Sequence, residues 1–220
     1  MVDGTVGIGV VAAGPYRDEL AQCLLSFKHF GQWRAGGVLA SCLGKALKAA
    51  LGNQAGFSLV PVPTSGSAYR RRGFSPVHLI LLILRLRRIE PQHRHLDVLE
   101  KVRIPLTRQD SMTSLLALVQ RYLNVVPARE STLGTSGQKG LGQGERARKV
   151  RGSMRVAPRR AGVVRGRRCI LVDDVLTTGA TLSEAARAVE AAGGVVCGAI
   201  VLAATRPPAY ASMRAPGDQP

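Results

Sequence analysis

The chain has 220 residues, 45% of them hydrophobic, and a net charge of +17 from 31 Lys and Arg against 14 Asp and Glu. This length and composition predict one domain with a single sizeable core over residues 1–205. The apolar run Val77–Leu84 has eight residues, whereas a membrane helix needs about 20, so a membrane span is excluded there. Because the amino end has no basic lead-in and the cysteines are few and scattered, we expect a cytoplasmic protein.

The elements predicted in the first half begin with a strand or coil at Gly7–Ala12. This segment matches G-x-G-x-x-A, but too few residues precede it for the strand that a dinucleotide site needs. We assign residues 1–52 to an amino-terminal or hood part. Phe57–Val62 predicts a central strand that ends near Pro63, because proline cannot donate a ladder hydrogen bond. Val77–Leu84 is expected to follow as a core helix.

The second half predicts one strand–helix–strand unit. Cys169–Val172 is a short apolar run typical of a strand buried on both faces. Leu182–Ala192 has apolar residues at helical spacing, and Val195–Ala203 is again almost wholly apolar. Such a unit has a right-handed crossover between parallel strands. The pattern therefore predicts an α/β fold with a central, mostly parallel sheet flanked by helices.

Three segments fall outside these elements. Residues 112–137 are interpreted as an insertion, within which Ser114–Leu123 predicts a short helix. Residues 206–220 are rich in proline and predict a disordered tail. His93 and His95 lie in a polar connector, where an exposed loop is a simpler interpretation than a metal site.

Polar residues follow the predicted strand Cys169–Val172 and carry the candidate chemistry. Ligands of open α/β sheets bind beyond the carboxyl ends of the strands. Asp173 and Asp174 stand at that end, where carboxylates accept hydrogen bonds from a ribose diol or orient a hydrated Mg²⁺. The next residues combine hydroxyls, a glycine and a helix amino terminus, which together suit a monophosphate; they are Thr177, Thr178, Gly179, Ala180 and Thr181. The alternative is an ordinary strand–loop–helix corner with a capping threonine.

A basic segment follows the other predicted strand, Phe57–Val62. Arg70, Arg71 and Arg72 stand next to Gly73. Guanidinium groups bind phosphate oxygens two at a time, which suits pyrophosphate. The alternative is a solvated basic turn that leads into a helix.

The stretch Val172–Thr181 resembles the phosphoribosyl-pyrophosphate (PRPP) signature of type I phosphoribosyltransferases, and every position of that signature is filled. The resemblance implies the type I phosphoribosyltransferase fold with a small hood or insertion. It also implies PRPP bound with Mg²⁺, and transfer of the phosphoribosyl group to an acceptor that the sequence does not identify.

Further blocks resemble the ComF family of late-competence proteins, which have a phosphoribosyltransferase fold. The resemblance covers about Tyr16 to Ala203. It implies a link to natural transformation at the inner face of the membrane, with an uptake helicase as partner. A non-catalytic DNA-uptake factor that binds single-stranded DNA is therefore the alternative to an enzyme. The blocks are Tyr16–Leu20, Phe27–Gly31, Val60–Pro63, Tyr69–Phe74 and Gln138–Gly152.

The chain departs from many ComF relatives, which open with a four-cysteine zinc knuckle. No C-x-x-C pair occurs here, so we expect no zinc site. Ser75 and Pro76 stand where the family commonly has Asn-Gln, and Lys149 replaces an expected asparagine. The cysteines are Cys23, Cys42, Cys169 and Cys197.

Basic residues are concentrated in 139–168, which contains eleven Lys or Arg and one acid, Glu145. Lys139, Arg146 and Lys149 are assigned to a lid over the pocket. The remaining charges favour contact with the phosphates of single-stranded DNA, although the segment has no aromatic residue for base stacking. A genome rich in arginine codons explains the same charges without a partner.

Overall fold

The computed structural model describes residues 8–30, 32–102 and 152–205. The predicted insertion at 112–137, the predicted tail at 206–220 and the lid residues Lys139, Arg146 and Lys149 lie outside this part of the chain.

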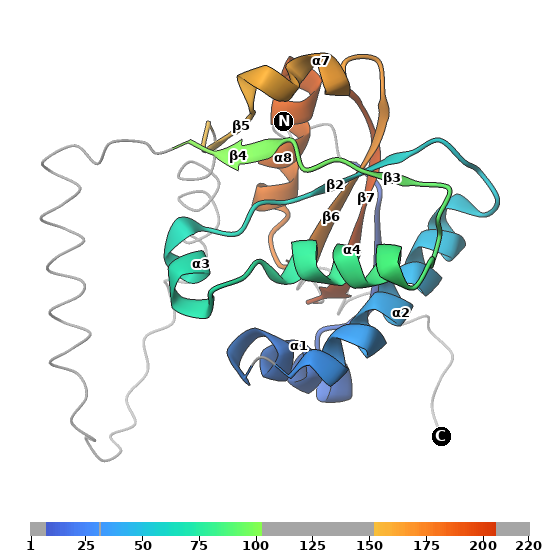
Figure 1. Cartoon of the computed structure of the whole chain (residues 1–220), viewed down its shortest axis with the longest axis vertical. Helices are drawn as coiled ribbons and strands as arrows, with labels where there is room; N and C mark the ends of the chain where they lie inside the picture. Colours follow the sequence, from blue (N-terminus) through green and yellow to red (C-terminus); the bar gives the residue numbers. More distant parts are fainter. Residues whose placement is uncertain (1–7, 31, 103–151, 206–220) are drawn as a thin grey trace, which may run out of the picture.

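A parallel five-stranded sheet forms the centre of the molecule (Figure 1), with strand order β1-β7-β6-β2-β3. Strand β6 lies in the middle, between β2 and β7, which explains why its apolar residues are buried on both faces. The strands are β1 (Val10–Pro15), β2 (Ser58–Pro61), β3 (Arg94–His95), β6 (Arg168–Leu176) and β7 (Val195–Ala204).

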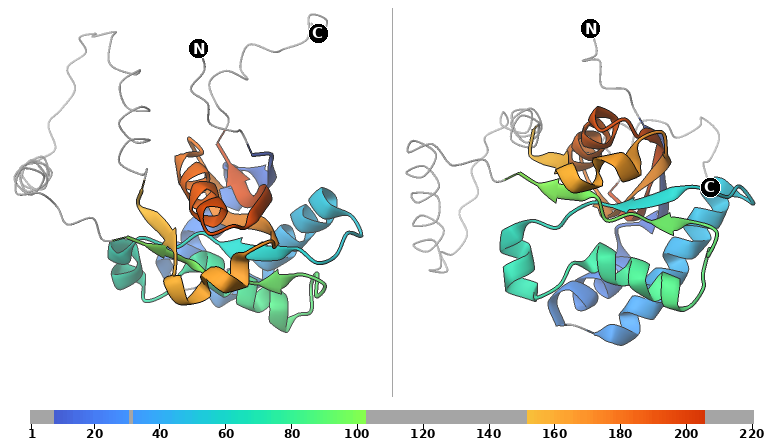
Figure 2. Two further views of the ribbon diagram at one scale, coloured as in Figure 1. Left: turned by 90° about the horizontal axis from the view of Figure 1, so that it is seen from above. Right: turned by 45° about the horizontal axis from the view of Figure 1, so that its top comes forward.

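Helices cover both faces of the sheet (Figure 2). One core lies under α1 (Asp18–Phe30), α2 (Trp33–Leu51) and α4 (Pro76–Leu86), with Leu43 and Ile80 fully buried within it. The second core lies on the other face of the sheet, under helices and a separate two-stranded sheet. The helices are α7 (Ala161–Val164), α8 (Ala180–Ala191) and the 3₁₀ turn η1 (Pro158–Arg160). The two-stranded sheet consists of β4 (Leu99–Lys101) and β5 (Met154–Val156). None of the described helices has the length and apolar character needed to cross a membrane.

The strand–helix–strand unit predicted for the second half is confirmed, with β6, α8 and β7 in that order and parallel pairing of the two strands. One boundary differs from the expectation. Strand β6 continues past Val172 to Leu176, so both Asp173 and Asp174 belong to the strand. The extension is held by register with β7, which pairs Asp173 with Val201 and Leu176 with Ala204.

An ion pair between the buried Glu184 and the partly exposed Arg187 fixes the two-stranded sheet to α8. Glu184 is 4% exposed, and its Oε1 accepts a hydrogen bond from the Met154 amide at 3.0 Å. Arg187 donates from Nη2 to the Met154 carbonyl at 2.9 Å and also to Glu184. Since β5 places Met154 opposite Lys101 of β4, α8 sets the position of Lys101.

Replacing Glu184 with glutamine should destabilise the fold at pH 7 by about 2 kcal/mol, because the change weakens the charge-assisted bonds to Arg187. Burial raises the pKa of Glu184, but hydrogen bonds from Arg187 and from the Met154 and Gly152 amides outweigh it, so the net pKa is lowered. The stabilisation is therefore present above the ordinary glutamate pKa and is lost on acidification.

Urea unfolding at pH 7 and pH 4 checks this prediction. The difference in the free energy of unfolding between wild type and Glu184→Gln should be smaller at pH 4 than at pH 7. The matched control is Glu190→Gln, an exposed position on the same helix, which should change stability little at either pH. If Glu184→Gln lost the same free energy of unfolding at both pH values, the ionised Glu184 carboxylate would not be the source of the stabilisation.

Candidate functional site

The acidic pair lies at the carboxyl end of the central strand, and both residues are half-buried. The segment that leaves β2 runs beside it, because the Val62 amide donates to the Val172 carbonyl at 2.9 Å. Loops after two neighbouring strands thus meet at this edge of the sheet, as expected for a ligand site in an open α/β fold.

The two carboxylates belong to opposite faces of the sheet. Successive strand residues alternate between faces, and Val172 packs in the core under α1, α2 and α4, whereas Leu171 packs in the core under α8. Asp174 therefore follows Val172 to the α1 side, and Asp173 follows Leu171 to the side of β4. A ligand that contacts both must lie across the end of β6.

Each carboxylate has a lysine from its own side of the sheet. Lys28 of α1 places Nζ 2.8 Å from Oδ2 of Asp174, with the two side chains 18% and 23% exposed. Lys101, the last residue of β4, interacts electrostatically with Asp173. Partial burial lowers the pKa of Lys101, and Asp173 opposes that effect. The site therefore combines two acids with two bases from elements far apart in the sequence.

The proton affinity of Asp173 is unusually high. Burial and the neighbouring charge of Asp174 raise the pKa of Asp173 to about 7, although the Asp174 amide, Lys28 and Lys101 act in the opposite direction. The Asp174 amide donates to Oδ1 of Asp173 at 2.8 Å. Near neutral pH Asp173 is therefore partly protonated, and a shifted pKa of this kind is common at functional sites.

The predicted phosphate loop connects β6 directly to α8. Thr177 and Thr178 are exposed, and Gly179 adopts φ 78° as the residue before the helix. Ala180 and Thr181 form the first turn, whose amide groups have no partner within the helix. Thr205 holds the base of the loop, donating from its amide and its hydroxyl to the Leu176 carbonyl at 3.0 and 3.2 Å.

The Gly179→Ala variant should lose about 1 kcal/mol of stability and bind inorganic phosphate more weakly, because a left-handed backbone is unfavourable for residues with a Cβ. Steric overlap does not contribute, since the nearest atom to such a Cβ is 3.8 Å away. Thermal unfolding and phosphate titration calorimetry test both effects. Gly162→Ala in α7 has open space and an ordinary φ and should not lose phosphate binding.

The three candidate pyrophosphate residues lie on a short helix, α3 (Gly66–Arg72), rather than in a loop. The Ser65 hydroxyl accepts a hydrogen bond from the Ala68 amide, and Gly73 ends the helix with φ 78°. Within the described residues no carboxylate is paired with these arginines. Arg70 and Arg71 are exposed, whereas Arg72 donates to the Ala68 carbonyl at 3.3 Å. The structure records no contact between them and the acidic pair.

A chain of hydrogen bonds anchors the segment that leaves β2. The hydroxyls of Thr64 and Ser75 lie 2.9 Å apart, and the Ser75 hydroxyl lies 2.8 Å from Nδ1 of His78. Nε2 of His78 lies 3.0 Å from Asp97, which also pairs with Arg160 at 3.3 Å. These contacts hold the loop after β2 against α4 and so fix one wall of the candidate site.

Sequence reasoning missed Lys28, Lys101 and Thr205. Lys28 lies in the Phe27–Gly31 block that resembles ComF, which was a usable signal, but no role was assigned to it. Lys101 and Thr205 had no local signal, because their positions depend on the register of β4 with β5 and on the end of β7.

Comparison with known proteins found a similar family and similar solved structures. Residues 121–214 match the family model described as "Phosphoribosyl transferase domain". Among solved structures, an adenine phosphoribosyltransferase from Thermoanaerobacter pseudethanolicus is similar at 17% identity and TM-score 0.38, over 80% of this chain and 83% of that one.

A second solved structure, described as the allosteric regulatory enzyme of purine biosynthesis, is similar at 18% identity and TM-score 0.35. The similarity covers 84% of this chain and only 30% of that protein. The search of curated proteins found no match. Residues 121–214 are thus similar to a phosphoribosyl transferase domain, and the parallel sheet flanked by helices has the type I phosphoribosyltransferase fold.

Proposed function

We propose that this protein binds PRPP with Mg²⁺ at the carboxyl end of β6 and transfers the phosphoribosyl group to a nitrogenous acceptor. One observation carries the proposal: the half-buried acidic pair lies near the carboxyl end of the central strand β6, and the threonine–glycine loop connects the end of that strand at Leu176 to the start of α8. A diol site and a monophosphate site are thereby adjacent, as the two ends of a ribose 5-phosphate require.

The loop residues bind the 5-phosphate in this proposal. The amides of Gly179, Ala180 and Thr181 lie at the amino end of α8, where backbone donors and the helix dipole favour an anion. The exposed hydroxyls of Thr177 and Thr178 add donors. Binding energy at this remote phosphate then holds the reacting carbon in position.

The acidic pair binds the ribose hydroxyls. The donor set also suits a Mg²⁺ ion shared with the substrate, because Mg²⁺ prefers oxygen ligands and commonly uses one or two carboxylates together with substrate phosphates and water. No group of three or more potential metal ligands occurs in the described part of the chain. When bound, the ion would neutralise the charge that develops on the departing pyrophosphate.

Cationic side chains assist the departure of pyrophosphate. In the reaction the bond from C1 of the ribose to the pyrophosphate oxygen breaks, and a bond from C1 to the acceptor nitrogen forms. Lys28 pairs with Asp174, and Lys101 interacts electrostatically with Asp173. Both lysines can contact the leaving group once the ligand engages the carboxylates. Arg70, Arg71 and Arg72 supply further positive charge from α3, the short helix that follows the neighbouring strand.

A narrower placement within the ComF family is also a proposal. It is supported by the sequence blocks and by the position of Lys28, since the block Phe27–Gly31 brings a lysine to Asp174. A role in DNA uptake and a helicase partner come from that resemblance alone. The proposal of a cytoplasmic location rests on the few, scattered cysteines, and that of single-stranded DNA as a partner rests also on the basic residues of 139–168. Of the basic segment 139–168, residues 139–151 lie outside the described residues.

Titration calorimetry with PRPP, with and without Mg²⁺, tests the proposed function. We expect saturable binding that strengthens with Mg²⁺ and is weaker for ribose 5-phosphate, which lacks the pyrophosphate. Pyrophosphate release measured with a panel of nucleobases then distinguishes transfer from binding alone, and salt-dependent binding of single-stranded DNA tests the uptake alternative. Absence of PRPP binding by a folded protein would overturn the proposal.

A further inference from the structure

The chain of hydrogen bonds that begins at Thr64 joins four parts of the fold beside the candidate site. Thr64 lies in the loop after β2, and Ser75 and His78 belong to the start of α4. Asp97 lies between β3 and β4 and also pairs with Arg160 of η1. Within the described part of the chain, Asp97 and Arg160 are the charged groups in contact with the His78 ring or with its carboxylate partner.

Ser75 occupies the capping position of α4 but does not cap the helix. A serine there normally accepts a hydrogen bond from an amide of the first turn, as Ser65 does from the Ala68 amide in α3. The Ser75 hydroxyl makes no such bond and instead lies 2.8 Å from Nδ1 of His78. A cap contributes about 1 kcal/mol, which α4 lacks because this hydroxyl belongs to the chain.

The direction of every hydrogen bond in the chain is fixed when the His78 ring is neutral. The Asp97 carboxylate only accepts, so Nε2 of His78 carries the ring proton and Nδ1 accepts. Ser75 has one proton and donates it to Nδ1. The contact of 2.9 Å between the Thr64 and Ser75 hydroxyls then requires the proton of Thr64. In this state Thr64 has no proton left for a ligand.

A second proton on the His78 ring reverses the chain. An imidazolium donates from both nitrogens, so Ser75 accepts from Nδ1 and donates its own proton to Thr64. The Thr64 hydroxyl then has a proton that is free to bind an anion. Histidine is the side chain that commonly gains or loses a proton near neutral pH. One proton taken up at His78 therefore provides one hydrogen-bond donor at Thr64.

Thr64 lies at the carboxyl end of β2, next to the end of β6. Pro61 pairs with Val172, and the Val62 amide donates to the Val172 carbonyl at 2.9 Å. Thr64 follows two residues after Val62, at the edge where open α/β sheets bind their ligands.

A second route connects the start of α4 to the acidic pair. Phe74, which precedes Ser75, packs against Phe27 of α1 with the ring centroids 5.6 Å apart in an edge-on arrangement. The next residue of α1, Lys28, pairs with Asp174. The hydroxyl chain is therefore fixed relative to the acidic pair through β2 and through α1.

We propose that His78 is a positioning residue for the pyrophosphate of PRPP: it takes up a proton from solvent as the ligand binds, so that Thr64 donates a hydrogen bond to a pyrophosphate oxygen. The inference rests on the proposed function. The connection from β2 to α4, which contains Thr64, also carries the arginines of α3, so pyrophosphate is the group assigned to this side of the site. When pyrophosphate leaves, His78 returns the proton to solvent.

Titration calorimetry of PRPP with Mg²⁺ at pH 7, in buffers of different ionisation enthalpy, measures the protons taken up on binding. The wild type should take up more protons per PRPP than His78→Gln. Asp173 can also exchange a proton on binding, but it does so in both proteins, so their difference isolates His78. Ribose 5-phosphate, which lacks the pyrophosphate, should show no such difference.

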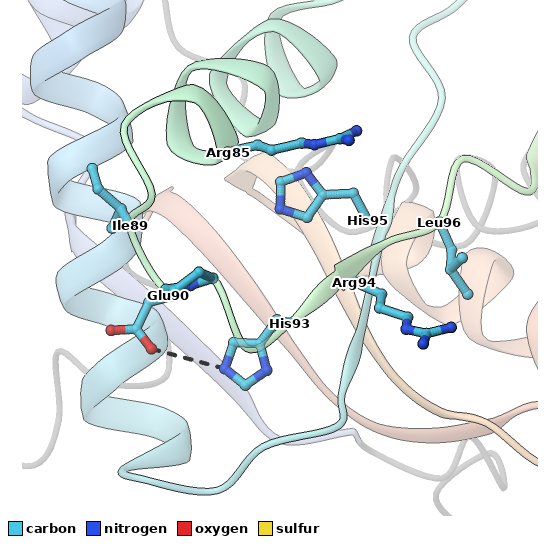
Figure 3. A pocket seen from close by; sticks show the side chains of 8 residues that line it. Arg85, Ile89, Glu90, His93, Arg94, His95 and Leu96 are labelled. Carbon is cyan, nitrogen blue, oxygen red and sulfur yellow. Dashed lines mark ion pairs between the residues drawn. The ribbon is translucent and has the colours of Figure 1, made fainter.

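His95 provides a matched control at the other end of the sheet (Figure 3). It belongs to β3, which pairs with the first residues of β2, so it lies toward the amino ends of the parallel strands. His95→Gln should take up protons as the wild type does. The neighbouring His93 is unsuitable, because its side chain is 0% exposed and packs on Phe57 with centroids 5.8 Å apart. This burial corrects the prediction of an exposed loop at His93.

Two variants of Thr64 test the hydroxyl itself. Thr64→Val keeps the shape but removes the donor, and should weaken PRPP binding about tenfold, as expected for one hydrogen bond to a charged group. Thr64→Ser keeps the hydroxyl and should retain most of the affinity. Neither variant should change the binding of ribose 5-phosphate. Nitrogen-15 NMR of the His78 ring should show that Nδ1 gains a proton when PRPP binds.

The outcomes separate this inference from the proposed function. Absence of PRPP binding by a folded protein would overturn both. PRPP binding with equal proton uptake in wild type and His78→Gln, or with unchanged affinity in Thr64→Val, would overturn the inference alone. If His78→Gln fails to fold, the NMR signals of the wild-type ring decide, and a ring that stays neutral with PRPP bound would contradict the role of His78.

Discussion

The Asp173→Asn variant is expected to be more stable than the wild-type protein at pH 8 and to bind PRPP about a hundredfold more weakly. Burial and Asp174 raise the pKa of Asp173 from 3.8 to about 7. Between these values the folded state holds a proton that the unfolded state has released, so stability falls as pH rises through that window. Above about pH 7 the folded protein carries the unfavourable negative charge of the buried Asp173 carboxylate.

Asparagine removes that charge and keeps an oxygen that can accept the Asp174 amide hydrogen bond. A shift of about three pKa units corresponds to about 4 kcal/mol. The pKa of about 7 already includes the attraction of Lys28 and Lys101, so we expect a net gain of up to about 4 kcal/mol. The loss of PRPP affinity follows from weaker hydrogen bonds to the ribose hydroxyls, since bonds to charged groups are worth about twice as much as neutral ones.

Urea unfolding at pH 5 and pH 8, with calorimetric titration of PRPP and Mg²⁺, measures both effects. At pH 5 the gain in stability should be much smaller, because wild-type Asp173 is then largely protonated. Asp18→Asn is the matched control, since Asp18 is an exposed aspartate whose positive φ of 50° suits asparagine equally well. Lower stability of Asp173→Asn at pH 8 would contradict the raised pKa, and unchanged PRPP affinity would contradict the site.

The sequence predicted β6, α8 and β7 well because local periodicity determines them. Burial on both faces requires continuous apolar residues in a central strand, and Leu182, Ala185 and Val189 form the buried face of α8. The strand end was placed too early because Asp173 and Asp174 are polar. Register with β7, a long-range effect, extends the ladder through them.

The candidate site was only partly predictable. The acidic pair and the loop at Gly179 form one contiguous motif, so their proximity follows from the chain itself. Lys28 reaches Asp174 only because α1 packs across the sheet, and no local pattern encodes that contact. The buried state of His93 had no local signal either, because it depends on Phe57 at the start of the neighbouring strand.

Lys28 gives the second large expected effect, because it acts as an internal counterion for Asp174. The Lys28→Met variant keeps the aliphatic bulk but leaves the acidic pair with one lysine fewer. The separation of 2.8 Å and the low exposure of both side chains imply a loss of about 2 kcal/mol at pH 8. Loss of Lys28 should also raise the pKa of Asp173 further, since Lys28 is one of the groups that lowers it. The destabilisation should therefore shrink at pH 5.

A double-mutant cycle separates this ion pair from simple packing. Lys28→Met combined with Asp174→Asn should recover most of the stability lost in Lys28→Met, with a coupling energy of about 1 kcal/mol or more. Lys48→Met on the exposed side of α2 should show no coupling to Asp174→Asn. Additive losses in the first cycle would show that the two side chains do not stabilise one another.

The affinity of the ligand-free protein for divalent cations tests the Lys28–Asp174 ion pair independently, because a change in side-chain packing alone would not strengthen cation binding. Lys28 competes with a metal ion for Asp174, so Mn²⁺, used as a probe of the Mg²⁺ site, should bind Lys28→Met about tenfold more tightly than wild type. Removal of one nearby positive charge at an effective dielectric of about 20 is worth at least that factor. Electron paramagnetic resonance of free Mn²⁺ measures the affinity without PRPP. If Lys28→Met binds Mn²⁺ no better than wild type or Lys48→Met, Asp174 does not bind the cation, and the carboxylates serve the ribose hydroxyls alone.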